Sequence, residues 1–112
     1  MKWQSEDRVN ALIVAPAGAI DHDSAEAFQE NLTTAMRRAS DFGGHLVVNF
    51  GGVDYMSSVG LRALMRVSKE AKGASIKISV ANLNSTMLEI FQISRFDKMF
   101  PVHDSVDAAI SD

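Results

Sequence analysis

Residues 45–50 read His-Leu-Val-Val-Asn-Phe, and this short apolar run constrains the fold more than any other feature of the chain. A continuous run of β-branched and aliphatic residues is typical of a buried strand whose sheet is covered on both faces. Glycine pairs at 43–44 and 51–52 predict turns on either side of it. The run therefore indicates a central strand of an α/β sheet.

Two segments with helical periodicity flank this strand. The first can be capped by Asp23 or Ser24, and the second ends at Gly73. Apolar residues spaced three and four apart place one stripe on each helix. The stripes are Ala25, Phe28, Leu32, Ala35, Met36 and Ala39 in the first helix, and Leu61, Leu64, Met65, Ser68 and Ala71 in the second.

Four further strand candidates complete the predicted sheet: residues 3–7, 11–17, 75–81 and 99–102. The first two are joined by a tight connection at residues 8–10, which predicts an antiparallel hairpin. The third alternates apolar and polar residues, which predicts that one of its faces is wet or thinly covered.

Two short helices are predicted near the C-terminus. Residues 82–84 open the first, and Asp104 or Ser105 caps the second. Their inward residues are Met87, Leu88 and Phe91 in the first helix, and Val106, Ala109 and Ile110 in the second. Strands that alternate with helices predict parallel neighbours joined by right-handed crossovers. We expect an α/β sandwich with a mostly parallel sheet, an antiparallel edge hairpin and about four helices, forming a single domain over residues 1–112.

Composition narrows the range of functions. The 112 residues carry a net charge of −3 and lack the basic face of a nucleic-acid-binding protein. Cysteine is absent, which excludes disulfides, cysteine nucleophiles and thiolate metal sites. No segment approaches the roughly 18 apolar residues that span a bilayer, and Glu6 and Asp7 disagree with the positive leader of a secretory signal. We expect a cytoplasmic protein that binds neither nucleic acid nor membrane.

Catalytic, cofactor and metal sites find little support. The glycines match no phosphate-binding loop, and the histidines at 22, 45 and 103 lie on separate predicted segments. A serine hydrolase would need Ser57 or Ser58 as its nucleophile. His45 or His103 would then be the base, with Asp21 orienting that base. The nucleophile motif of such enzymes has a glycine two residues before the serine, and neither serine has one. We expect no metal, no cofactor and no catalytic residues. A small nucleotide-binding or hydrolytic α/β protein is retained as an alternative.

Ser57 and Ser58 are the most informative positions, because a loop enters the second long helix there. Either serine can cap that helix by accepting a hydrogen bond from an amide of its first turn. The same amides and the helix dipole also tolerate a phosphate, so a serine here can gain negative charge without unfolding the domain. The position suits a cap or a phosphorylation switch.

Three segments resemble the STAS domain, the small α/β module of bacterial anti-sigma factor antagonists that also occurs on sulfate transporters. They are Gly-Ala-Ile-Asp at 18–21, Leu-Val-Val-Asn-Phe-Gly-Gly-Val-Asp-Tyr-Met-Ser-Ser-Val-Gly-Leu-Arg at 46–62, and Phe-Gln-Ile-Ser-Arg-Phe-Asp-Lys-Met-Phe at 91–100. The middle segment is the specific one, and the resemblance covers nearly the whole chain.

The resemblance implies an interaction module that works by partner switching. In the antagonist type, the unphosphorylated module binds an anti-sigma factor that is also a serine kinase, and the sigma factor is freed. The kinase phosphorylates a serine at the start of the second helix, the complex dissociates, and a serine phosphatase resets the module. The module has no catalysis of its own.

The family pattern at the switch is an acidic residue, two hydroxyl residues, a glycine and an aliphatic residue, with phosphate on the second hydroxyl. Aligned on Gly60 and Leu61, this chain has Ser57 at the acidic position, Ser58 at the first hydroxyl and Val59 at the acceptor position. We predict Ser58 as the acceptor, with Ser57 as the alternative. The rival hypothesis, which Val59 favours, is a constitutive docking or scaffold module that is not phosphorylated.

The partner surface is expected at the carboxyl ends of the parallel strands, where α/β sheets usually place functional loops. Asp21 is expected there to orient the acceptor, to contact the kinase, or to shape the turn that enters the first helix. The predicted partner-binding residues are Asp21, His22, Ser24, Asp54, Met56, Ser57, Ser58, Val59, Gly60, Leu61, Asn82 and Asn84.

Overall fold

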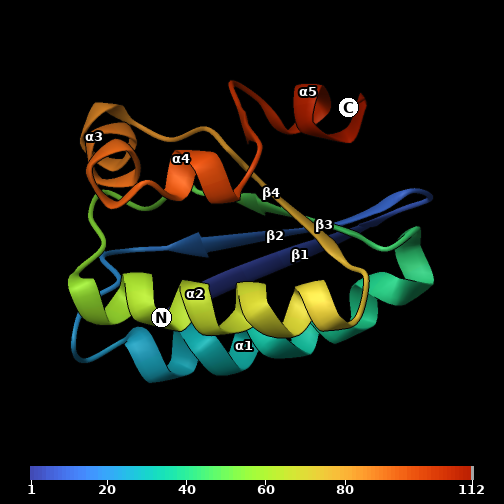
Figure 1. Ribbon diagram of the computed structural model, residues 1–112, viewed down its shortest axis with the longest axis horizontal. Coiled ribbons are helices and arrows are strands. Elements are labelled where there is room, and N and C mark those ends of the chain that lie inside the picture. The colour runs from blue at the N-terminus through green and yellow to red at the C-terminus, as the bar shows by residue number, and fades with distance from the viewer. Residues whose placement is uncertain (112) are drawn as a thin grey trace.

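Five strands form one mixed sheet in the order β1-β2-β3-β4-β5 (Figure 1). The computed structural model describes residues 1–111, and Asp112, the last residue of the predicted domain, lies outside the described residues. The strands are β1 Lys2–Arg8, β2 Ala11–Ala17, β3 His45–Asn49, β4 Lys77–Ala81 and β5 Val102–His103. β1 pairs antiparallel with β2, and the other neighbouring strands are parallel. The predicted sheet with its antiparallel edge hairpin is confirmed.

The helices cover both faces of this sheet. They are α1 Ala25–Arg38, the 3-10 helix η1 Ala39–Phe42, α2 Ser58–Gly73, α3 Ser85–Ser94, α4 Phe96–Met99 and α5 Val106–Ser111. α1 and α2 lie side by side across one face, and α5 lies on the other (Figure 1). The four predicted helices are present as α1, α2, α3 and α5, while α4 and η1 are short additions.

The main core lies between the sheet and the pair α1 and α2, and α3 and α4 close its end. Alternate residues of β2, β3 and β4 face this core, among them Leu12, Leu46 and Val80, each fully buried. Five phenylalanine rings connect the layers, with centroid separations between 5.7 and 6.5 Å. They are Phe28, Phe50, Phe91, Phe96 and Phe100. This packing joins α1, α3 and α4 to the carboxyl end of β3.

The second face of β4 is buried at Ser79 and exposed at Lys77, so the prediction of a wet or thinly covered face holds only in part. Ser79 is 0% exposed, and its Oγ lies 2.8 Å from His45 Nε2 in a hydrogen bond between β4 and β3. Beside this pair, α5 places Ala109 against Ala81 and Val47 in a second, smaller core. Ser79 is therefore satisfied by His45 of the neighbouring strand, while Lys77 on the same face is exposed.

Two local predictions near the C-terminus are wrong. Leu88 is exposed, while Met87 and Phe91 on the same helix are buried as expected. The last strand is shorter than predicted, because Met99 belongs to α4. Arg95 separates α3 from α4 with a left-handed φ of 64°, and this backbone reversal creates the additional helix.

An exposed ion pair joins the two long helices. Arg37 Nε of α1 donates to Glu70 Oε2 of α2 at 2.7 Å, and Arg37 Nη2 donates to Glu70 Oε1 at 3.3 Å. The hydrogen bond and the negative charge of Glu70 raise the pKa of Arg37 above its ordinary value. Exposed pairs of this kind contribute little to stability, so this one chiefly sets the local charge pattern.

Candidate functional site

Two loops meet beyond the carboxyl ends of β2 and β3. Three backbone hydrogen bonds join them: Gly18 N to Gly52 O at 2.9 Å, Ile20 N to Tyr55 O at 2.9 Å, and Ser57 N to Ile20 O at 2.8 Å. These loops lead into α1 and α2, so the amino ends of the two helices lie together at one end of the sheet (Figure 1). We call residues 18–24, 51–61 and 82–84 the carboxyl-end surface.

Gly60 allows α2 to start this close to the first loop. A Cβ atom on Gly60 would lie 2.7 Å from Met56 Cγ and 2.8 Å from Ile20 Cγ2, closer than carbon atoms can approach. Met56 is itself only 2% exposed. Met56 and Gly60, both predicted as partner-binding residues, are therefore buried, and they seat the first turn of α2.

The two serines occupy different environments. Ser57 is the N-cap of α2; its Oγ accepts from the Gly60 amide at 3.4 Å, and the residue is half-buried. Ser58 is the first residue of the helix and is exposed. Val59 is half-buried and borders a hollow of about 280 Å³ between α1 and α2, which His22 also lines. Of the two hydroxyls, that of Ser58 is the accessible one.

Asp21 shapes the turn that enters α1. Its Oδ1 accepts from the amides of Asp23 at 3.0 Å and Ser24 at 3.2 Å. Ser24 Oγ accepts from the Asp21 amide at 3.0 Å and donates to Ala19 O at 2.9 Å. Ser24 stands at the N-cap position, but its side chain makes no capping bond to the helix. The prediction that Ser24 caps this helix is thus correct in position, but the expected side-chain bond is absent, and Asp21 Oδ1 accepts from the two amides just before the helix.

The loop after β4 is tied to β3 by an amide pair. Asn82 Nδ2 donates to Asn49 Oδ1 at 3.0 Å, and the same Oδ1 accepts from the Gly51 amide at 2.9 Å. Asn82 has a left-handed φ of 61°, which asparagine adopts more readily than most residues. Asn84 caps α3, because its Oδ1 accepts from Met87 N at 2.8 Å. Sequence reasoning missed Asn49, although an amide side chain inside an apolar strand was a visible signal.

The predicted partner-binding residues in the loops after β2, β3 and β4 thus lie at one end of the sheet. The exposed members are His22, Asp54, Ser58 and Asn84, and the half-buried members are Asp21, Ser24, Ser57, Val59, Leu61 and Asn82. His45 lies elsewhere, at the amino end of β3, and pairs with Ser79 rather than with Ser57 or Ser58. The arrangement offers a polar surface around an exposed hydroxyl at a helix start, which suits binding and modification.

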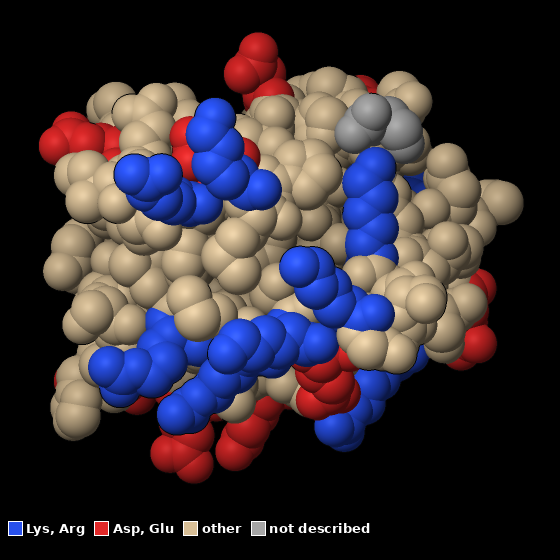
Figure 2. Space-filling model, in the orientation of Figure 1, with Lys and Arg blue, Asp and Glu red and all other residues tan. Residues whose placement is uncertain are grey.

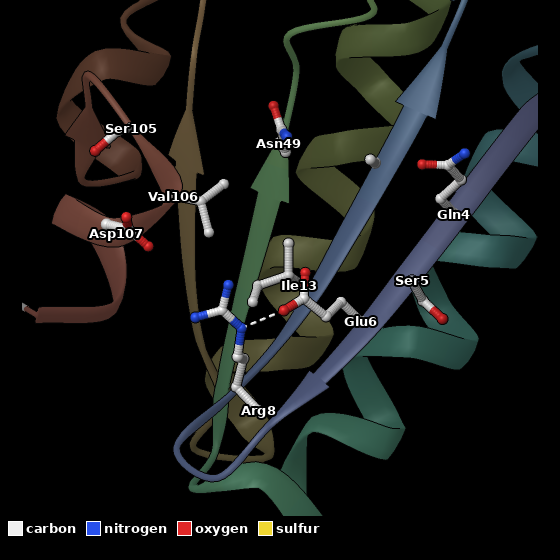
Figure 3. A pocket seen from close by; sticks show the side chains of 10 residues that line it. Gln4, Ser5, Glu6, Arg8, Ile13, Asn49, Ser105, Val106 and Asp107 are labelled. Carbon is white, nitrogen blue, oxygen red and sulfur yellow. Dashed lines mark hydrogen bonds and ion pairs between the residues drawn. The ribbon is translucent and has the colours of Figure 1, made fainter.

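A larger hollow, of about 500 Å³, lies on the other face of the sheet, between α5 and β1 (Figure 3). Ile13 and Ala15 form part of its lining, together with the paired side chains of Arg8 and Glu6. The hydrogen bond and charge of Glu6 raise the pKa of Arg8 above its ordinary value. None of the predicted site residues lines this hollow.

Among residues 1–111, no group of three His, Cys, Asp or Glu side chains lies close enough together to hold a metal ion. In the same part of the chain, no helix combines the length and the apolar character needed to cross a membrane.

Nearly the whole chain matches a known family. The STAS domain matches residues 2–109 of the chain, so the protein belongs to the STAS domain family. The resemblance inferred from the three sequence segments is confirmed.

Similar proteins carry names of anti-sigma factor antagonists. BtrV of Bordetella bronchiseptica, named as a candidate anti-sigma factor antagonist, is 28% identical over 104 residues, which cover 92% of this chain and 87% of BtrV. The structure of an anti-sigma factor antagonist from Mycobacterium paratuberculosis matches with a TM-score of 0.84 at 23% identity, covering 98% of this chain and 91% of that one. The antagonist SpoIIAA in its unphosphorylated form matches with a TM-score of 0.77 at 19% identity, covering 98% and 94%. A structure of Bacillus SpoIIAA in the phosphorylated form matches with a TM-score of 0.70 at 20% identity, covering 98% and 97%.

Proposed function

We propose that this protein is an anti-sigma factor antagonist that acts by partner switching in the cytoplasm. Its unphosphorylated carboxyl-end surface binds an anti-sigma factor of the serine-kinase type, and phosphorylation of Ser58 ends that binding. A serine phosphatase restores the binding form. The chain acts as one STAS domain and performs no catalysis of its own. The names of the relatives and the solved forms of SpoIIAA support the proposal.

The exposure of Ser58 at the start of α2 is the observation that carries this proposal. A kinase must reach the hydroxyl, and Ser58 is exposed while Ser57 is half-buried and occupied as the N-cap. The first turn of this 16-residue helix contains no acidic side chain. A phosphate on Ser58 would therefore meet the positive end of the helix dipole without local repulsion within that turn.

The same phosphate would change binding more than folding. It adds close to two negative charges in the middle of the carboxyl-end surface, next to loops that already carry Asp21, Asp23 and Asp54. A partner fitted to the unphosphorylated surface would face an uncompensated charge. Such a charge weakens binding at an interface by roughly several kcal/mol. Release of the partner follows without any rearrangement of the fold.

Val59 at the usual acceptor position supports a second candidate, a constitutive docking module. In that case the surface would bind its partner in one form only, and neither serine would be modified. The two candidates differ in one chemical event, the transfer of phosphate to a serine at the start of α2.

Phosphopeptide mapping separates them. The wild type, Ser58→Ala and Ser57→Asn are incubated with Mg²⁺, ATP and a kinase-type anti-sigma factor from the same organism. Asparagine at 57 removes the hydroxyl but keeps a capping side chain. We expect one phosphate on the wild type and on Ser57→Asn, and none on Ser58→Ala. Phosphate retained by Ser58→Ala would contradict the choice of residue, and binding without any phosphate on the wild type would favour the constitutive module.

A further inference from the structure

One face of α2 carries a line of cations. Arg62, Arg66 and Lys69 follow Ser58 at spacings of four, four and three residues, so all four side chains lie on one side of the helix. All four residues are exposed, and the line is about 16 Å long. Figure 2 shows Lys and Arg side chains gathered in a band over α2. We call Arg62, Arg66 and Lys69 the cationic ridge.

The ridge forms no close ion pair within residues 1–111, although Glu26 of α1 lines the same hollow as Arg62 and Arg66. Glu70, the acidic residue of α2, is paired with Arg37 of α1. For the part of the chain from 1 to 111, none of the ion pairs involves a member of the ridge. The whole chain has a net charge of −3, so the ridge is a local excess of positive charge on an acidic protein.

The ridge does not benefit the helix that carries it. Like charges three and four residues apart repel and lower helix stability. Glu70 lies four residues after Arg66, but it is paired with Arg37 of α1. The ridge therefore gains no ion pair within its own helix, and a negatively charged partner would supply one.

We infer that the cationic ridge docks an acidic protein surface on the anti-sigma factor. The inference rests on the proposed function, because Ser58 stands at the head of the ridge and connects it to the carboxyl-end surface. Opposite charges across an interface accelerate encounter and fix the register of the two partners. A phosphate on Ser58, four residues before Arg62, would pair with that arginine and remove part of the attraction.

The surroundings of the ridge favour a protein over nucleic acid or lipid. Glu26 and Glu30 are exposed on α1, which packs beside α2, and Figure 2 shows acidic side chains below the band. A phosphate backbone is negative along its whole length and would be repelled by these carboxylates, whereas a protein can place acidic groups opposite the ridge and other groups opposite α1. Helices that bind a lipid surface insert a broad apolar face, whereas the exposed side of α2 is occupied by the cations.

The test compares two variants with the same change in net charge. The ridge variant carries Arg66→Glu and Lys69→Glu and leaves Arg62, the neighbour of Ser58, in place. The control carries Lys2→Glu and Lys98→Glu, two exposed cations on β1 and α4. Binding of each unphosphorylated protein to the kinase-type anti-sigma factor is measured by calorimetry at about 50 mM and about 300 mM NaCl, because salt screens exposed charges. Thermal melting verifies that both variants fold.

We expect the ridge variant to bind about tenfold more weakly than wild type at low salt and to lose most of its salt dependence. The control should stay within about twofold of wild type. If the two variants bind the anti-sigma factor equally well and the wild type also binds it, the assignment of the ridge as a docking surface is overturned and the proposed function is left intact. Failure of wild type to bind would overturn both. Ridge-dependent binding to duplex DNA or phosphatidylglycerol vesicles, without an effect on the anti-sigma factor, would also overturn the assignment to a protein surface.

Discussion

Adjacent serines perform different tasks at the start of α2. Ser57 accepts from the Gly60 amide and donates its own amide to Ile20 O, so its position is fixed on both sides. Ser58 projects from the first helical position and is exposed. The sequence placed a cap and a switch at these two positions without separating them, because either serine satisfies the rules for an N-cap.

Removing each hydroxyl should affect stability differently. We predict that Ser57→Ala lowers the free energy of unfolding by about 1 kcal/mol, since the cap is lost. Ser58→Ala should change it by less than about 0.5 kcal/mol, as is usual for exposed positions. Urea denaturation followed by circular dichroism measures both. A larger loss for Ser58→Ala than for Ser57→Ala would contradict the division of tasks.

Position 60 requires glycine because neighbouring side chains leave no room for a Cβ atom, and not because of its backbone conformation. We predict that Gly60→Ala destabilises the protein by about 1–3 kcal/mol, because its methyl group would overlap Met56 and Ile20. Gly73→Ala is the matched control at the other end of α2, where a Cβ would meet nothing within 4 Å. It should leave stability unchanged or raise it by up to about 1 kcal/mol. Equal melting temperatures for the two variants would argue against the close contact of Gly60 with Met56 and Ile20.

The connections between elements hold the carboxyl-end surface in shape. The Asn49–Asn82 amide pair joins the ends of β3 and β4, and the left-handed backbone of Asn82 starts the loop to α3. We predict that Asn82→Ala is more destabilising than Asn82→Gly by about 1 kcal/mol, because alanine resists the left-handed conformation that glycine accepts. Both variants lose the amide, so the difference in denaturation midpoint isolates the backbone effect. No difference would mean that the loop adopts another conformation.

The order of elements could be predicted from local patterns, because the strands and helices carry distinct hydrophobic periods. The errors arose where tertiary contacts decide. Ser79 alternates as though one face of β4 were wet, yet α5 covers it and His45 satisfies it. Leu88 lies next to the inward position of Met87, but it is 38% exposed while Met87 and Phe91 are buried. A four-residue helix such as α4 has too short a pattern to detect.

The candidate site could be predicted in position but not in detail. Parallel strands in sequential order bring the loops after β2, β3 and β4 to one end, as expected. The turn into α1 was one of three roles that the sequence offered for Asp21, and the local bonds of Asp21 Oδ1 agree with it. The sequence could not show that Met56 is buried beneath Gly60, because that depends on how closely the two loops approach.

At the scale of the whole molecule, the phenylalanine cluster connects the helices to the sheet. Phe91 lies at its centre, with centroid distances of 6.0 Å to Phe50, 5.7 Å to Phe96 and 6.3 Å to Phe100. Domains of this kind have a total stability of only about 5–15 kcal/mol. The loss of one ring from this cluster would therefore remove a large share of that stability.

Truncating this ring should be among the most damaging single changes. We predict that Phe91→Ala costs about 3–5 kcal/mol, through lost burial and the cavity left behind. Ile93→Ala on the same helix, at a residue 76% exposed, should change stability by less than about 0.5 kcal/mol. Thermal and urea unfolding of both variants decide the comparison. A mild effect of Phe91→Ala would show that α3 contributes little to the core.

The central claim is that an added phosphate on Ser58 switches this molecule between a form that binds an anti-sigma factor and a form that does not. The most direct measurement titrates a preformed complex of a sigma factor and its kinase-type anti-sigma factor with this protein, and follows free sigma factor by size-exclusion chromatography. The unphosphorylated protein should release the sigma factor in proportion to the amount added, and the protein phosphorylated on Ser58 should release none. Equal release by the two forms, or none by the unphosphorylated form, would contradict the account.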